Sequence, residues 1–293
     1  MLKSNYDIAL QLRVDYDNGR RLSVEQALSK LKESDLIEKL TSDLQEKPLF
    51  YIWRIIALSE IPYTTHLSYT QNLIDRIYDR LSTPFGFSLG GDEKSFLPCY
   101  NAMLVSALSR LGRANDNEVR QAVEWIGQHQ PMERGIIVQL PKFNFSRHGG
   151  CFNKTPCYIN IAKSVMALLE YEKATRCHDF ESKREQGIEY ILAHHLYKRL
   201  HASKPITSHI LDISFPESYH LNIVELLRIA SLSQKMSDAR VDDAIKYLLS
   251  IKHSEGWTVS YRYRADGYVA FDKGVKAGAW VSYILNRALK IKQ

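Results

Sequence analysis

Thiol and imidazole side chains recur along the chain at intervals of about sixty residues. Cys99 and Cys157 are 58 residues apart, and His220 follows Cys157 after a further 63 residues. Cys151 lies six positions before Cys157, within the stretch RHGGCFNKTPCYIN at 147–160. Cysteine sulfur and histidine nitrogen are ligands that zinc prefers in proteins. These four side chains therefore form a candidate zinc site if the fold brings them together.

The same thiols also have a purely structural interpretation. Free cysteine behaves as a small apolar residue, and it is among the residue types most often buried. Cys99 and Cys157 would then fill tight helix starts without taking part in chemistry. Both interpretations stay open on the sequence alone. Disulfides are not expected, because we expect a reducing, cytoplasmic compartment.

The elements that position these residues are predicted to be helices. Apolar residues follow a helical period nearly everywhere; Val119, Ala122, Val123 and Ile126, for example, mark one buried stripe. Alternation typical of strands is scarce, and only GIIVQL at 135–140 and WTVSYRY at 257–263 are candidates for short strands. The pattern predicts an all-α protein.

The predicted helices come in similar pairs, which indicates an internal repeat. Strongly apolar helices are expected near 48–61, 97–112, 155–171, 216–232 and 276–291, and more amphipathic helices lie between them. Such αα-hairpins build an open solenoid or a closed ring. We predict an α/α toroid of about five to six hairpins around a central cavity. One domain spans 1–293, with a helical prelude or cap at 1–46 and the repeats at 47–293.

In such a ring the inner helices run the same way, so that their N-termini share one rim. Cys99, Cys157 and His220 are each expected in the first turn of an inner helix, and Arg147, His148 and Lys154 in the loop before Cys157. Helix N-termini attract anions through free N–H groups and the helix dipole. We therefore expect a positive rim, to which Arg262 and Arg264 would add charge.

Two segments carry a resemblance to a known superfamily. The sequence KTPCYINIAKSVMAL contains Cys157-Tyr158, and SYHLNIVELL contains Tyr219-His220. These pairs, with the turns in EWIGQHQPMERGI and HSEGWTV, resemble the α/α-toroid superfamily over roughly 48–291. That superfamily contains protein prenyltransferase β subunits and squalene-type terpenoid cyclases. The likeness is closer to the prenyltransferases, whose Cys-Tyr and Tyr-His pairs begin successive inner helices.

The resemblance implies a zinc site. In the prenyltransferases an Asp two positions before the cysteine, the cysteine and the histidine hold zinc, which implies Cys157 and His220 as ligands and as the catalytic residues. Thr155 stands where the family has that Asp. Cys151 or Cys99 would then supply the missing ligand.

The resemblance also implies a substrate. Basic residues and a tyrosine hold the prenyl diphosphate in the family, and the corresponding residues here are substrate-binding candidates. They are Arg147, His148, Lys154, Tyr158, Tyr219 and Tyr100. The expected function is a prenyltransferase-like transferase that binds an isoprenoid diphosphate, or another amphipathic small molecule, and acts on a peptide or small-molecule acceptor.

Other functions stay open beside this one. A non-catalytic toroid would hold a lipid or a peptide without chemistry. A terpenoid cyclase-like enzyme would use the same rim, although the Asp-rich protonating motif of that family is absent. A scaffold would use the exterior of the ring for protein contacts, and the clean amphipathic pattern of the outer helices disfavours it.

The composition of the chain narrows the classes of ligand and partner that remain. The chain has 39 basic and 33 acidic residues, a net charge of +6 that suits an anionic ligand. No basic block or nucleic-acid motif accompanies this charge, so we expect no nucleic-acid partner. No apolar run approaches the roughly 20 residues of a membrane span, and no signal peptide is recognised. We expect a cytoplasmic protein.

Overall fold

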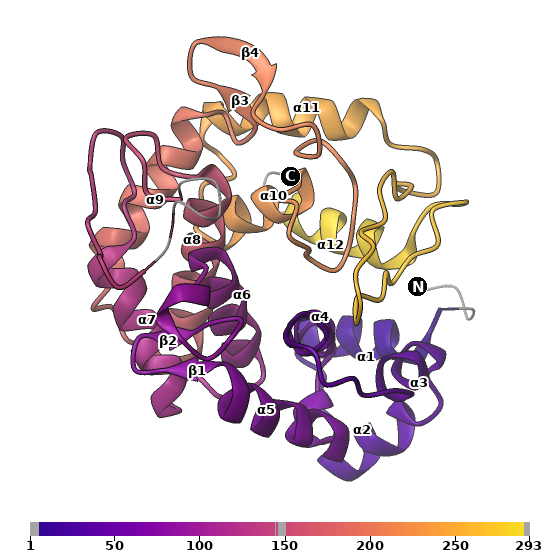
Figure 1. Ribbon diagram of the computed structural model, residues 1–293. Helices are drawn as coiled ribbons and strands as arrows, with labels where there is room; N and C mark the ends of the chain where they lie inside the picture. The colour runs from indigo at the N-terminus through magenta and orange to yellow at the C-terminus, as the bar shows by residue number, and fades with distance from the viewer. Residues whose placement is uncertain (1–5, 144, 146–150, 290–293) are drawn as a thin grey trace.

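The computed structural model describes residues 6–143, 145 and 151–289, and its architecture is all-α, as predicted. One set of helices is buried along most of its length: α4 (Pro48–Ser59), α6 (Pro98–Arg110), α8 (Tyr158–Thr175), α10 (Ile223–Leu232) and α12 (Ala279–Leu289). Amphipathic helices alternate with them along the chain: α5 (Ser68–Leu81), α7 (Asn117–His129), α9 (Glu181–Ala193) and α11 (Asp242–Ser250). In Figure 1 the first set lies nearer the centre and the second set lies outside it.

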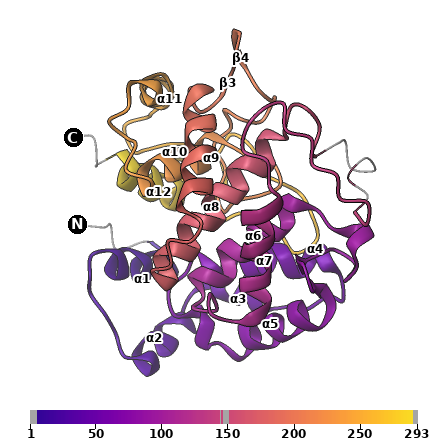
Figure 2. The ribbon, with the colours of Figure 1, turned by 90° about the vertical axis from the view of Figure 1, so that its left-hand side faces the viewer.

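The buried helices neighbour one another in chain order. Helix α6 packs between α4 and α8, and α10 packs between α8 and α12, while α5, α7 and α9 pack on α4, α6 and α8 respectively. Figure 2 shows α6 and α8 side by side. Arg110, the last residue of α6, pairs with Glu60, which directly follows α4, and with Glu170, in the C-terminal third of α8. Because helix ends of the same kind meet, these helices run in the same direction, as predicted.

The N-terminal segment is helical, as expected for the prelude. It forms α1 (Ile8–Asp17), α2 (Val24–Leu31) and α3 (Asp35–Thr41). Ser23 and Gln26 form a reciprocal capping box at the start of α2. Asp17, at the end of α1, accepts a hydrogen bond from Tyr283 of α12 (2.9 Å) and so links the two ends of the chain.

Strands are short and lie elsewhere than predicted. The pairs are β1 (Ser82–Thr83) with β2 (Gly86–Phe87) and β3 (Lys198–Arg199) with β4 (Ala202–Pro205), both antiparallel. Neither 135–140 nor 257–263 forms a strand, so that prediction was wrong; the second contributes only an isolated bridge between Thr258 and Ala277. Each segment lacks a neighbouring strand to complete a ladder.

No helix in the described ranges combines the length and the apolar character that a membrane crossing demands. The buried faces of the helices pack against one another and form one hydrophobic core.

The start of α10 depends on a single side chain. The Asn222 Oδ1 atom accepts hydrogen bonds from the N–H groups of Val224 (2.9 Å) and Glu225 (3.2 Å), and its amide donates to Ser214 O. We expect Asn222→Ala to lower the free energy of unfolding by about 1–2 kcal/mol, since two helical donors lose their partner. Urea denaturation would measure this change. Asn222→Ser, which keeps an accepting side-chain oxygen at the cap without adding a charge, should lose clearly less, and an equal loss would contradict the capping role.

Candidate functional site

The described residues bring three thiols together at the N-terminal ends of α6 and α8. Cys99 is the second residue of α6, and Cys157 is the N-cap of α8. The N–H of Cys157 donates to the carbonyl of Cys151 (3.3 Å), which folds the intervening loop back on itself. Burial raises the pKa of the Cys99 thiol, and the nearby Cys157 and Cys151 thiols raise it further. Without another partner, Cys99 therefore stays protonated at neutral pH.

Aromatic rings cover these thiols. Tyr100 and Tyr219 are stacked with their ring centroids 6.0 Å apart, and Trp53 lies 5.8 Å from Tyr100 and 5.1 Å from Tyr263. Burial raises the pKa of Tyr219 to about 12, with further contributions from Cys99, Cys157 and Cys151. Tyr219 is still 37% exposed. We call these thiols and rings the thiol–aromatic rim; its members are Trp53, Cys99, Tyr100, Cys151, Cys157, Tyr219 and Tyr263.

His220 lies beside this rim but not in the predicted helical turn. Helix α10 begins at Ile223, so His220 belongs to the loop before it. Its ring contacts His209 (4.3 Å between centroids), Tyr261 and Tyr263 (both 5.6 Å). Burial lowers the pKa of His220, and the neighbouring His209 lowers it further. The imidazole is therefore neutral at physiological pH.

The fit of this rim to zinc can be tested from its donor groups. Across the described stretches, no group of three or more His, Cys, Asp or Glu side chains is arranged to hold a metal ion. The ring of His220 contacts the rings of His209, Tyr219, Tyr261 and Tyr263. This arrangement does not fit a zinc site as it stands. Zinc binding stays a prediction from the sequence.

The remaining predicted substrate residues are dispersed. Tyr158 is buried, donates a hydrogen bond to Leu196 O and contacts the rings of Tyr190 and His194 on α9. It packs the α8–α9 hairpin and does not face the rim, because the helical turn directs it toward α9. Lys154 is exposed. Arg147 and His148 lie outside the described residues.

A groove adjoins the rim on the segment 260–270. It has a volume of about 620 Å³, and Tyr261, Arg262, Tyr263 and Arg264 contribute to its walls. Gly267 adopts φ +85°, and a Cβ atom there would lie 2.6 Å from the backbone of Phe50. Glycine therefore lets this segment approach α4 closely, which brings Tyr263 against Trp53.

A buried ion network lies farther along the same helices, toward their C-terminal ends. Glu60 is fully buried and pairs with Arg228 (2.7 Å), Arg110 (3.0 Å) and Arg13 (3.4 Å). Arg110 also pairs with Glu170 (2.9 Å) and contacts Glu217. Burial would raise the pKa of Glu60, yet the arginines lower it to about 2.

The network continues toward the rim through Lys163. Its ammonium donates to Glu217 (3.1 Å), to the carbonyl of Ser218 (2.9 Å) and to Glu225. Lys163, Glu217 and Glu225 are each at most 5% exposed. Burial raises the pKa of Glu225 to about 7; Lys163 opposes this rise, and Glu217 adds to it. The residues that join the inner helices are therefore charged.

Charged residues on or directly after α4, α6, α8 and α10 thus meet between these helices. The missed signal is visible in the sequence: Glu60, Arg110, Lys163, Glu225 and Arg228 interrupt otherwise apolar helices. Buried charges are expected to occur in pairs, so these interruptions indicate ionic partners between helices.

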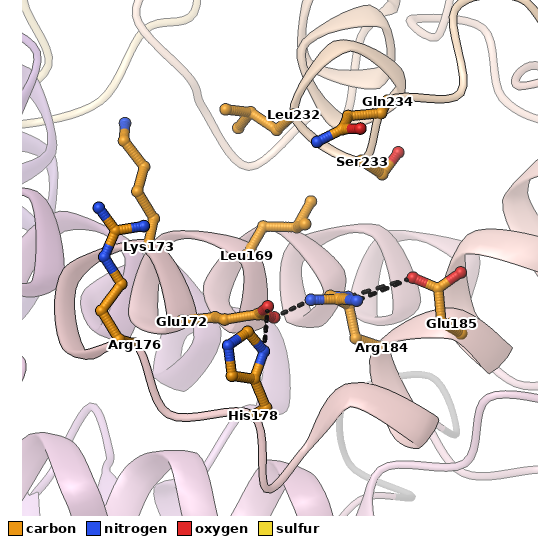
Figure 3. Close-up of a pocket in the computed structure, with 10 residues that line it drawn as sticks. All are labelled: Leu169, Glu172, Lys173, Arg176, His178, Arg184, Glu185, Leu232, Ser233 and Gln234. Carbon is orange, nitrogen blue, oxygen red and sulfur yellow. Dashed lines mark hydrogen bonds and ion pairs between the residues drawn. The ribbon is translucent and has the colours of Figure 1, made fainter.

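Another hollow, of about 470 Å³, lies at the far end of α8 (Figure 3). Its carboxylates already have partners: Glu172 pairs with His178 (2.8 Å) and Arg184, and Arg184 also pairs with Glu185 (3.0 Å). At 1.5 Å per helical residue, this end of α8 is roughly 24 Å from Cys157. The hollow is therefore separate from the thiol–aromatic rim.

Comparison with known proteins gives no match to a family model, to a curated protein or to a solved structure. The site is therefore interpreted from its own geometry.

Proposed function

We propose that the chain is a prenyltransferase-like α/α toroid and that the thiol–aromatic rim binds an isoprenoid diphosphate. The observation that carries the proposal is the gathering of aromatic rings around three thiols at helix N-termini. The chain-order packing of the inner helices supports the toroid, as does the contact of Asp17 with Tyr283. Aromatic faces and edges suit an unsaturated hydrocarbon chain.

The isoprenoid would lie across the rim and not along the ring axis. The buried ion network lies between α4, α6, α8 and α10, and hydrocarbon inserted there would disrupt its ion pairs. The groove beside Tyr263 offers a route along the surface. Arg262 and Arg264 are exposed there, and in the described part of the chain neither has an ion-pair partner. Guanidinium groups bind phosphate oxygens with paired hydrogen bonds, so these two would hold the diphosphate.

Transfer of the chain to an acceptor would break its bond to a diphosphate oxygen. Arg262 and Arg264 would stabilise the charge that develops on that oxygen. The acceptor would be a peptide or a small molecule. Zinc binding stays a prediction from the sequence, and no step of the proposed transfer depends on it.

A second candidate function is binding without chemistry. The raised pKa of the Cys99 thiol and the absence of a ready metal group in the described ranges favour it. Release of pyrophosphate from a bound prenyl diphosphate in the presence of peptide acceptors would distinguish the two. Turnover supports the transferase, whereas tight binding without release supports the binding module.

The proposal predicts that Tyr219→Ala weakens binding of farnesyl diphosphate about tenfold, because one wall of the rim is lost. Calorimetric titration would measure the affinity, and ligand-dependent rise in Tm would give a second readout. Tyr16→Ala is the matched control, since Tyr16 is 40% exposed and lies on α1.

Two results would overturn the proposal: no binding of any prenyl diphosphate, or equal affinity in wild type and Tyr219→Ala. Elemental analysis of protein purified without chelator tests the zinc prediction in the same preparation. Stoichiometric zinc that is lost in both Cys157→Ala and His220→Ala would support it.

A further inference from the structure

One ammonium group anchors the loop that carries Tyr219 and His220. Lys163 of α8 donates to the side chain of Glu217 and to the backbone carbonyl of Ser218, the two residues just before Tyr219. Its third contact is Glu225 in the first turn of α10. Lys163 is 1% exposed. Arg110 also contacts the Glu217 carboxylate (3.3 Å), and Tyr268 donates to the carbonyl of Pro216 (2.8 Å). Lys163 is the group that joins this segment to Glu225 of α10, so the position of the segment relative to α10 depends on how Lys163 divides its hydrogen bonds.

Glu225 is incompletely satisfied in this arrangement. Its Oε2 atom accepts from Lys163, but its buried Oε1 atom has no hydrogen-bond partner among the described residues. An unpaired buried carboxylate oxygen is costly, and protonation relieves that cost. Glu225 and Glu217 also compete for the same ammonium, so their negative charges repel one another across it.

Charged and titratable groups on α8, on α10 itself and on two loops act on Glu225. Lys163 faces it from α8, Glu217 from the preceding loop and Arg228 from α10. Tyr268, on the groove segment, also interacts with Glu225 electrostatically. The Lys163 ammonium thus lies between the buried carboxylates of Glu217 and Glu225. Both terminal nitrogens of Arg228 already donate to the carboxylate of Glu60.

We propose that Glu225 is a positioning residue that acts through Lys163: loss of its proton draws the ammonium from Glu217 and Ser218 and loosens the segment that carries Tyr219 and His220. If the rim binds a prenyl diphosphate, its affinity should therefore depend on pH, and this consequence rests on the proposed function. The loosening of the segment is expected in the protein without ligand and does not depend on that function. The pKa of Glu225, raised by burial to about 7, places the change near neutrality.

Hydrogen exchange of the segment 217–222, followed by mass spectrometry without ligand, tests the structural part. The ratio of its exchange rate in wild type to that in Glu225→Gln cancels the intrinsic pH dependence of exchange. Glutamine mimics the protonated carboxyl, so the ratio should be near one at pH 6. We expect it to rise at least fivefold by pH 8, with a midpoint near pH 7.

Two further variants sharpen the test. Glu189→Gln, an exposed residue of α9 that pairs with Arg240, should exchange as wild type at every pH. Glu217→Gln removes the competing charge and should move the midpoint below pH 7. If Glu225→Gln folds poorly, the free peptide 217–222 of each protein supplies the intrinsic exchange rates instead, and the midpoints of wild type and Glu217→Gln can still be compared. A ratio that stays flat from pH 6 to 8 would overturn the proposal, as would an unmoved midpoint in Glu217→Gln.

The ligand experiment separates this inference from the proposed function. Farnesyl diphosphate should bind wild type more weakly at pH 8 than at pH 6 by at least threefold, relative to Glu225→Gln. If the exchange ratio rises but no prenyl diphosphate binds at either pH, the positioning role of Glu225 is supported and the proposed function fails. If a prenyl diphosphate binds while the exchange ratio stays flat, the proposed function is supported and the positioning role of Glu225 fails.

Discussion

Glu60→Gln is expected to lower the free energy of unfolding by about 3–5 kcal/mol, the usual cost of removing one partner from a buried ion pair. Glu60 is the carboxylate on which Arg13, Arg110 and Arg228 converge, and it is fully buried. A neutral amide leaves the positive charge of these guanidinium groups poorly compensated. Urea denaturation at pH 7 would measure the loss.

The same residue predicts acid sensitivity. The pKa of Glu60 is lowered to about 2 in the fold, whereas its ordinary value is 4.5. Its carboxylate therefore contributes stability above pH 4.5, and about 3 kcal/mol is lost as the pH falls from 4.5 toward 2. Glu60→Gln should lack this part of the acid dependence.

A matched control is Glu38→Gln, since Glu38 is an exposed residue of α3. It should change the free energy of unfolding by less than about 0.5 kcal/mol. If Glu60→Gln were as mild as this control, the network would not be a stabilising connection between α1, α4, α6 and α10.

Local periodicity was sufficient to predict the helices. The stripe Val119, Ala122, Val123 and Ile126 is buried on α7, as expected from its i, i+3, i+4, i+7 spacing. Pro48 and Pro98 begin α4 and α6, which agrees with the preference for proline at the first helical position. These features act within one helical turn, so the sequence displays them directly.

The start of α10 shows where local signals fail. Pro216 suggested a helix start, but the helix begins seven residues later, after the cap supplied by Asn222. The intervening residues are held by Lys163 of another helix. That contact joins residues more than 50 positions apart, and no local pattern encodes it. His220, which the sequence predicts in the first turn of this helix, consequently lies three residues before it.

The buried ion network around Glu60 and Lys163 likewise could not be predicted from local sequence patterns. A charged residue in a mostly apolar helix indicates that it has an ionic partner. The residues around it in the sequence do not show which residue that partner is. Arg110 could be read as a solvated helix end, yet it contacts Glu60, Glu170 and Glu217 from three other segments. Only the packing order of the helices determines which charges meet. The sequence could therefore predict the rim better than the interior.

Lys163→Met is the second change with a large expected effect. Methionine keeps an unbranched apolar stem of four heavy atoms, as in lysine, but removes the only ammonium that contacts both Glu217 and Glu225 in the described part of the chain. We expect the free energy of unfolding to fall by about 3–5 kcal/mol at pH 8. Urea denaturation at pH 6 and pH 8 would measure the loss.

The loss should depend on pH with a definite sign. The pKa of Glu225 is already raised to about 7, so its contribution favours folding when it is protonated and weakens as the pH rises from 4.5 toward 7. Without Lys163 that pKa rises further, and each pH unit above 7 adds up to about 1.4 kcal/mol to the cost of the substitution. The double variant Lys163→Met with Glu225→Gln removes the second buried charge and should recover part of the stability at pH 8. A loss that is equal at both pH values and is not relieved in the double variant would mean that Lys163 acts through packing alone, because a missing methylene contact does not titrate.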